Sequence, residues 1–341
     1  MSQHPPQAAT PAVPAGQRTT ERAGGSAVPG RPTSPRSAPG PARGGRRRQS
    51  RGARAAPWLL MSPSLALLLV MTVFPAAYIF WSSVHSQTLL GGSSEFVGLQ
   101  NYTDAVTDPG QRHSLVVTVA FVVVAVVLEL VIGLLLALPL AAQSRSNNVA
   151  TALMLLPFAV TPAVSALVFR ELANPNYGWI DWLMGVVGLP AHVEWLSNPS
   201  TAWMILIGLD VWQWTPFVAL ILMAGLQSMP TEPLEAAAID GAGRFQTFRY
   251  VKLPLLTPFL AIAVVLRTIQ AFKTFDSFKV LTGGGPGSST ENLNLDIYRV
   301  ALQSFRIGAA SATAVIFLLL LSLLVPLLLR VIGRGSDPDE V

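Results

Sequence analysis

The chain alternates between long apolar stretches and short polar ones. Six apolar segments each reach or approach the roughly 20 residues that a helix needs to cross about 30 Å of hydrocarbon. They occupy residues 58–82, 114–142, 149–171, 201–227, 255–273 and 309–333. The pattern predicts an all-α, polytopic membrane protein with six transmembrane helices. The fifth segment is the shortest, and its helix can begin before Pro254.

Polar segments flank a predicted membrane domain at residues 56–335. Residues 1–55 consist mainly of Pro, Gly, Ala, Ser and Arg, with almost no large apolar side chain. Such a segment cannot bury enough surface to offset its ordering entropy, so we expect a disordered cytoplasmic tail. Residues 336–341 form a short cytoplasmic C-terminus in this interpretation.

Composition supports a membrane protein: 51% of the 341 residues are hydrophobic and 12% are charged, against about 25% charged in soluble domains. The net charge of +5 arises in the tail, where ten arginines face one glutamate. This basic tail is typical of a topology signal that contacts anionic lipid. A regulatory or nucleic-acid role for the tail is the alternative, and we expect no nucleic-acid partner for the membrane domain.

The distribution of Lys and Arg predicts the orientation. A cytoplasmic N-terminus places sixteen basic residues inside and five outside. Basic residues favour the cytoplasmic side, so both termini are expected there, in a multi-pass protein of the plasma or inner membrane. The apolar stretch 178–189 is too short to span, and we expect an amphipathic helix on the outer surface. Trp179, Trp182 and Trp195 are its expected interfacial anchors.

Residues 228–254 form the only sizeable cytoplasmic loop between predicted spans. Thr231 suits the N-cap of a helix and Pro233 suits its first turn. Glu232 and Glu235 favour the same helix N-terminus because of the helix dipole. The loop therefore predicts a short helix at 234–240.

The same loop contains a helix stop and a second helix. Gly241 and Gly243 permit a left-handed backbone or a close approach by another chain. The second helix is predicted at 245–252, ending before Pro254 because the residue before a proline disfavours helix. Two short helices that project from the membrane can dock to a partner, although an ordinary amphipathic connector would look similar.

The loop resembles the EAA motif of ABC-importer permeases, which dock to a cytoplasmic ATPase. The matching positions are Glu235, Ala236, Ala237, Gly241, Leu253 and Pro254. The resemblance implies that the loop couples the chain to that ATPase. The implied coupling residues are Glu235, Ala236, Ala237, Asp240 and Gly241.

Other segments resemble carbohydrate-import permeases with the type I fold of the maltose transporter's membrane subunits. They are residues 96–102 (FVGLQNY), 156–158 (LPF), 174–178 (NPNYG), 211–217 (VWQWTPF), 274–276 (TFD) and 281–287 (LTGGGPG). The resemblance covers roughly residues 58–330, and the tail inherits no role from it.

The resemblance implies partners and excludes catalysis by this chain. The implied partners are a second homologous permease subunit, a dimer of ABC ATPases and an extracytoplasmic sugar-binding protein, all assembled in membrane lipid. ATP would bind to the ATPase subunits, so the chain itself needs no cofactor and is not an enzyme. A permease for a non-sugar solute, such as glycerol phosphate, is the alternative, and the sequence does not identify the sugar.

Three charged residues lie inside predicted spans: Glu129, Asp210 and Arg267. Charges in hydrocarbon are costly and usually face a bundle interior or cavity. All three lie at similar depth, and we predict that Arg267 pairs with one or both acids, with direct contact to substrate as the alternative.

A sugar site combines aromatic platforms with polar groups. The candidates for the substrate path are Trp212, Gln213, Trp214, Arg267, Gln270, Lys273 and Asp276. Trp214 lies beside Pro216, so helix packing is an equal interpretation of that residue.

Several other chemistries are excluded. The glycine-rich stretch 283–290 lacks the lysine of a phosphate-binding loop and is expected to be a flexible external turn near the substrate gate, facing a binding protein. The chain has no cysteine, and its four histidines form no HExxH, so no metal site is expected. No Asp-x-Asp suggests a membrane glycosyltransferase, and a passive channel would not need a coupling loop.

Overall fold

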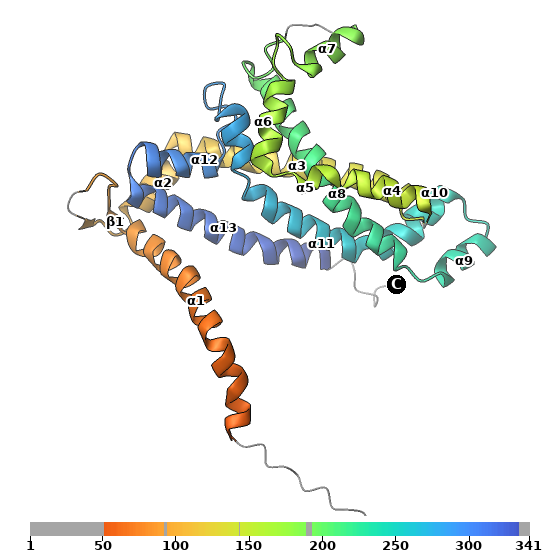
Figure 1. The fold of residues 1–341 in the computed structure, drawn as a ribbon, viewed down its shortest axis with the longest axis horizontal. Helices are drawn as coiled ribbons and strands as arrows, with labels where there is room; N and C mark the ends of the chain where they lie inside the picture. The colour runs from red at the N-terminus through yellow and green to blue at the C-terminus, as the bar shows by residue number, and fades with distance from the viewer. Residues whose placement is uncertain (1–50, 92–93, 143, 189–192, 334–341) are drawn as a thin grey trace, which may run out of the picture. The chain divides into compact units, whose positions relative to one another are not determined.

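The computed structural model describes the backbone of residues 51–91, 94–142, 144–188 and 193–333 (Figure 1). The chain divides into two compact units, Met1–Met61 and Ser62–Val341. Of the first unit only residues 51–61 are described, and they belong to helix α1 (Arg51–Ser83). The predicted tail therefore lies outside the described residues up to residue 50, and residues 51–55 are helical. The predicted C-terminus, 336–341, also lies outside the described residues.

The fold is helical, as the hydropathy pattern predicts. Within the described ranges, five helices are long and apolar enough to cross a membrane as single helices. They are Leu60–Ser83 of α1, α3 (Pro109–Leu140), α8 (Pro199–Gln227), the continuous helix Arg244–Phe272 that contains α11 (Leu253–Phe272), and Ile307–Arg330 of α13 (Ile307–Gly333).

The third predicted span, 149–171, is not a single helix. It consists of α4 (Arg145–Met154), α5 (Leu156–Ala159) and α6 (Pro162–Leu172), with a bend of 93° between α5 and α6. Val160 and Thr161 are extended, with ψ angles of 141° and 142°. Pro162 disfavours helical backbone in the residue before it, which explains the break. Counted as one bent span, this pair gives six.

The predicted helix end before Pro254 is wrong. The helix α10 (Arg244–Gln246) passes through a π-helical turn, η1 (Thr247–Lys252), directly into α11. In this turn the Leu253 N–H donates to the Phe248 carbonyl, one residue farther back than in an α-helix. The wider turn allows the chain to continue through Pro254, which has no N–H to donate. The fifth span therefore does begin before Pro254.

The core forms where α3, α8 and α11 lie side by side (Figure 1). One apolar cluster surrounds Phe121, Leu206 and Phe278, and a second surrounds Val218 and Leu222. Gly133 of α3 permits the close approach of α8, because a Cβ there would lie 2.8 Å from the Val218 Cγ1 atom.

A set of short elements connects the spans at one end. They are β1 (His85–Ser86), β2 (Glu95–Phe96), α2 (Gln100–Thr107), η2 (Phe278–Thr282), α12 (Leu293–Tyr298) and η3 (Arg299–Gln303). The two strands pair antiparallel, and Asn101 donates to the carbonyls of Ser83 and His85 at 2.9 and 3.0 Å. Asn101 thereby fixes the turn that follows α1.

The predicted surface helix is present as α7 (Trp179–Val186). Trp179 and Trp182 are exposed, as expected of interfacial anchors. The prediction for Trp195 is wrong: only 8% of its surface is exposed, and it packs in the apolar cluster around Phe121. An aromatic residue in a polar loop gives no signal that distinguishes these two environments.

Candidate functional site

The predicted coupling loop begins with α9 (Glu232–Ile239), which starts two residues earlier and ends one residue earlier than the sequence predicts. Pro233 occupies the first turn as expected, but the Thr231 side chain makes no capping hydrogen bond. Its backbone carbonyl accepts instead, from the N–H groups of Leu234 and Glu235 at 3.0 and 2.9 Å. Thr231 therefore occupies the N-cap position, as the sequence predicts, but it caps the helix through its backbone carbonyl and not through its hydroxyl.

After α9, Gly241 adopts a left-handed backbone conformation that ends the helix, as the sequence predicts. Its φ of +75° is left-handed, a conformation that side chains with a Cβ disfavour. The Ala242 N–H donates to the Ala237 carbonyl at 2.9 Å, which closes the helix end. Gly243 has an ordinary φ of −68° and serves as the N-cap of α10, where its N–H donates to Gln246 Oε1 at 2.9 Å.

The helix α9, the predicted coupling helix, presents an uncovered surface. Glu235, Ala236, Asp240 and Gly241 are exposed, and Ala237 is half-buried. Ile239 is 86% exposed, so most of this apolar side chain is available to a partner. A short helix with small residues, acidic ends and an unburied isoleucine is suited to enter a groove on another protein.

The three membrane charges meet, as predicted. Arg267 of α11 forms ion pairs with Glu129 of α3 and with Asp210 of α8. The Arg267 Nη2 atom lies 2.7 Å from Glu129 Oε1, and it also donates to Asp210 Oδ2. All three side chains are at most 1% exposed. We call this group the buried charge triad, and it joins the three central spans.

Trp214 connects the triad to the broken span. The Arg267 guanidinium carbon lies 4.8 Å from the centre of the Trp214 ring, a cation–π contact. The Trp214 ring also packs edge-to-face on Phe158 of α5, with ring centres 5.5 Å apart. Trp214 therefore both packs between helices and lies beside the buried charge triad.

The other candidates for the substrate path separate into two groups. Gln213 is 2% exposed, and its Nε2 atom donates to the Val160 carbonyl at 2.7 Å. Trp212 is 43% exposed and packs against Phe169 of α6. Three residues at and after the end of α11 are exposed, and their side chains make no hydrogen bond or ion pair within the described residues: Gln270, Lys273 and Asp276.

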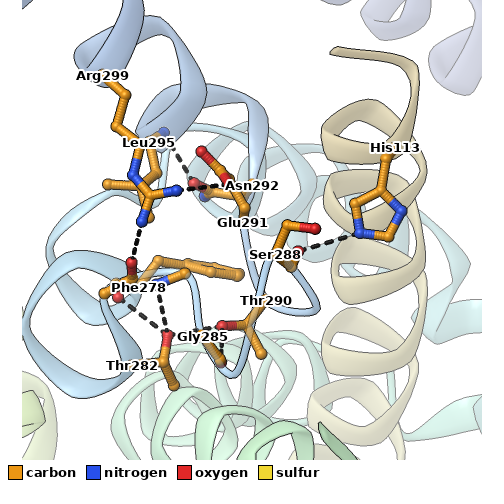
Figure 2. A network of polar contacts seen from close by, with 12 residues as sticks. His113, Phe278, Thr282, Gly285, Ser288, Thr290, Glu291, Asn292, Leu295 and Arg299 are labelled. Atoms are coloured by element: carbon orange, nitrogen blue, oxygen red, sulfur yellow. Dashed lines mark hydrogen bonds and ion pairs between the residues drawn. The ribbon is translucent and has the colours of Figure 1, made fainter. Parts of the chain in front are cut away.

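The glycine-rich stretch 283–290 is held in place, in contrast to the flexible turn expected. Arg299 donates to the Gly283 carbonyl and forms an ion pair of 2.6 Å with Glu291. From the opposite side, the His113 ring nitrogen lies 3.0 Å from the Ser288 carbonyl (Figure 2). Inside the loop, Thr290 donates to the Gly285 carbonyl at 2.7 Å.

Residues that the sequence does not single out provide this rigidity. The Trp203 indole of α8 donates to the Ser289 carbonyl at 2.9 Å. Asn292 and Asn294 donate to the carbonyls of Thr274 and Phe272 at 2.6 and 2.7 Å, which satisfies the end of α11. Their long sequence separation leaves no local motif that could reveal them.

Asp296 of α12 is a further group that sequence analysis misses. Burial, together with the negative charges of Glu291 and Asp108, raises the pKa of Asp296 to about 6, although Arg299 opposes the shift. Within the described residues, no cluster of three His, Cys, Asp or Glu side chains could hold a metal ion.

Comparison with known proteins gives a consistent result over most of the chain. Residues 129–337 match the family model described as the binding-protein-dependent transport system inner membrane component. The trehalose/maltose transport system permease protein MalF of Thermococcus litoralis is 38% identical over 266 residues, which cover 78% of this chain and 90% of that protein. The sulfoquinovosyl glycerol transport system permease protein SmoG of Agrobacterium fabrum is 32% identical, with 82% and 90% covered.

A third relative and one solved structure extend this result. The sn-glycerol-3-phosphate transport system permease protein UgpA of Yersinia enterocolitica is 34% identical over 281 residues, or 82% of this chain and 94% of that protein. A chain of a bacterial alginate ABC transporter, crystallised with an alginate pentasaccharide-bound periplasmic protein, superposes with a TM-score of 0.73 at 18% identity. The superposition covers 85% of this chain and 99% of the alginate transporter chain, and this likeness shows a shared fold.

Proposed function

The chain belongs to the binding-protein-dependent transport system inner membrane components, and we propose that it is the permease subunit of an ATP-driven importer that moves a sugar into the cytoplasm. The substrate is a mono- or oligosaccharide, or a polyol. Relatives named for trehalose and maltose and for sulfoquinovosyl glycerol support this substrate class.

The observation that carries the proposal is the exposed coupling helix. It contains the EAA motif, its end is fixed by the left-handed Gly241, and the described part of the chain leaves 86% of Ile239 exposed. A pair of ABC ATPases, bound through Glu235, Ala236, Ala237, Asp240 and Gly241, would provide that cover. ATP binding and hydrolysis take place on those subunits, so this chain needs no cofactor and catalyses no covalent step.

The triad supports a rigid-body mechanism. Because Arg267 joins α3, α8 and α11, these spans move together when the ATPases close on the coupling helices. The chain and a second, homologous permease then rock between inward-open and outward-open states. The chain contributes a difference in stability between two conformations, which is what ATP binding shifts.

The substrate path is lined by candidate residues whose side chains are exposed and can therefore contact a sugar. Exposure supports roles in sugar binding for Trp212, Gln270, Lys273 and Asp276. Gln213 and Arg267 have structural partners and act on the path indirectly, while Trp214 contributes through its ring. A sugar-binding protein delivers substrate at the outer face, where the pinned loop 283–290 offers a fixed docking surface. The spans lie in the cell membrane, and both termini lie in the cytoplasm.

Uptake of radiolabelled solutes by a strain that lacks this gene, with and without the wild-type gene restored, tests the function. We expect restored uptake of at least one sugar or polyol. Glycerol phosphate belongs in the panel because relatives named for it cover 82% of the chain. If uptake of glycerol phosphate alone is restored, the importer assignment stands and the sugar assignment is wrong. No restored uptake of any solute in the panel contradicts the proposed function.

A further inference from the structure

A hollow of about 400 Å³ lies beside the coupling loop. We call it the basic hollow, and its lining residues are Leu138, Ala242, Arg244, Thr247, Phe248 and Lys252. Leu138 lies two residues before the last residue of α3, and Arg244 is the first residue of the continuous helix Arg244–Phe272. Because both residues lie at the ends of spans, the hollow is at the membrane boundary, on the side of the coupling loop.

The hollow contains two cations that have no partner among the residues that the structure describes. Arg244 is exposed and Lys252 is half-buried. The ion pairs of the described residues join Arg267 and Arg299 to other acids, and the side chains of Arg244 and Lys252 form no hydrogen bond or ion pair there. This is notable because the same loop contains three exposed acids, Glu232, Glu235 and Asp240, none of which neutralises either cation.

The remaining wall of the hollow is apolar. Leu138 and Phe248 are half-buried, and the Thr247 hydroxyl is already used, since it donates to the Gly243 carbonyl at 3.1 Å. A ligand that fits must therefore combine a negative charge with an adjoining hydrocarbon portion. An anionic phospholipid has this chemistry, and such lipids are part of the membrane at this depth.

We propose that the basic hollow binds the headgroup of an anionic phospholipid. Its phosphate lies between Arg244 and Lys252, and the start of its acyl chains lies against Leu138 and Phe248. Basic pockets between membrane helices on the cytoplasmic side bind such headgroups. The bound lipid bridges α3 and η1 where the coupling loop enters α11. It therefore stabilises the loop relative to the spans and makes transport dependent on anionic lipid, a consequence that rests on the proposed function.

The binding test uses the full chain in detergent, titrated with phosphatidylglycerol and, separately, with phosphatidylcholine, and read by native mass spectrometry. Each basic residue near an anionic lipid surface contributes roughly a fivefold gain in affinity. The Arg244→Gln/Lys252→Gln variant should bind its tightest phosphatidylglycerol about 25-fold more weakly than wild type. Arg249→Gln is the matched control, because Arg249 is also in η1 but does not line the hollow.

The functional test uses the assembled transporter in vesicles of phosphatidylcholine with and without one-fifth phosphatidylglycerol. We expect several-fold faster uptake by wild type and by Arg249→Gln when phosphatidylglycerol is present, and no such gain in the double variant. Equal phosphatidylglycerol affinity in the wild type and the double variant would overturn the proposal.

Two further outcomes separate the explanations. If the double variant keeps its phosphatidylglycerol affinity but loses association with the ATPase in detergent, the hollow faces the ATPase and the lipid proposal is wrong. If wild type binds phosphatidylglycerol at the hollow but transports no solute in any vesicle, the proposed function fails and the binding site stands.

Discussion

The side-chain amide of Gln213 donates a hydrogen bond of 2.7 Å to the backbone carbonyl of Val160, which lies 53 residues earlier in the chain. Val160 is the first extended residue at the break between α5 and α6. Inside a membrane, every backbone polar group needs a partner within the protein. Gln213 therefore stabilises the break itself, and this role explains a buried glutamine in an otherwise apolar span.

Replacing Gln213 should destabilise the protein. Gln213→Leu leaves the Val160 carbonyl without its donor, at a cost of about 1–3 kcal/mol. The measurement is thermal unfolding of the purified chain in detergent. Gln227→Leu is a matched control, because Gln227 is on the same helix and donates to the Ala141 carbonyl at 3.3 Å, but in an exposed position. Equal melting temperatures for the two variants would show that the buried Gln213–Val160 hydrogen bond stabilises the protein no more than the exposed Gln227–Ala141 bond.

The buried charge triad predicts an order of severity among substitutions. Arg267→Met leaves two buried carboxylates without a cation and should cost about 3–5 kcal/mol, which is a large fraction of a typical folding free energy. Glu129→Gln should be much milder, because Asp210 still pairs with Arg267. The readout is the yield of monodisperse protein together with its melting temperature.

A neutral triad provides the control for this order. The triple variant Glu129→Gln, Asp210→Asn and Arg267→Met removes all three charges and should recover much of the yield lost by Arg267→Met alone. No recovery would indicate that the shape of Arg267, rather than its charge, supports the packing of α3, α8 and α11.

Hydropathy and depth were enough to predict most of the fold and the triad. Counting residues from the span ends placed Glu129 and Arg267 at one level, and their pairing follows because charges in hydrocarbon need partners. The break at Val160 was not predicted, because an average over an apolar stretch is insensitive to the local effect of Pro162 on the preceding backbone. The π-helical turn at η1 was not predicted either, since no residue type specifies it.

The coupling site shows a similar division. The left-handed Gly241 was predictable because glycine is the residue that adopts such a backbone at low cost. The pinning of loop 283–290 was not predictable, since His113 lies 175 residues from Ser288 and Arg299 lies 16 residues from Gly283. Hydrogen bonds between distant residues require the fold before they can be identified.

Gly241→Asp should abolish transport while leaving membrane insertion intact. A Cβ at Gly241 meets nothing within 4 Å, but any side chain strains this left-handed backbone. Because Asp and Asn are the side chains that tolerate it best, the further effect of Asp falls on the surface that we propose the ATPase covers. Uptake and the amount of protein in the membrane are both measured. Gly241→Asn is the control, because Asn has similar size, tolerates a left-handed backbone and adds no charge. Loss of uptake in Gly241→Asp but not in Gly241→Asn would implicate the negative charge at the proposed ATPase interface. Wild-type uptake by Gly241→Asp would contradict the coupling role of this position.

The raised pKa of Asp296 predicts a pH-dependent stability. In the folded chain this pKa rises from an ordinary value of 3.8 to about 6, first because of burial and then because Glu291 and Asp108 repel a third negative charge. The folded state therefore binds a proton more tightly than the unfolded state. The stabilisation is fully present below about pH 3.8 and is lost as the pH rises through about 6. Asp296→Asn mimics the protonated form and should melt at a higher temperature than wild type at pH 7.5.

This advantage of Asp296→Asn should shrink steadily as the pH is lowered to 5, because wild-type Asp296 then takes up its proton. Melting curves of the two proteins at each pH provide the test, and their difference removes the contribution of all other titrating groups. Asp276→Asn, which removes one exposed carboxylate, is the control for a simple change of net charge. A constant difference between wild type and Asp296→Asn from pH 5 to 7.5 would mean that Asp296 does not titrate in this range. Arg299 would then have to outweigh burial and the charges of Glu291 and Asp108 in order to hold the Asp296 carboxylate ionised.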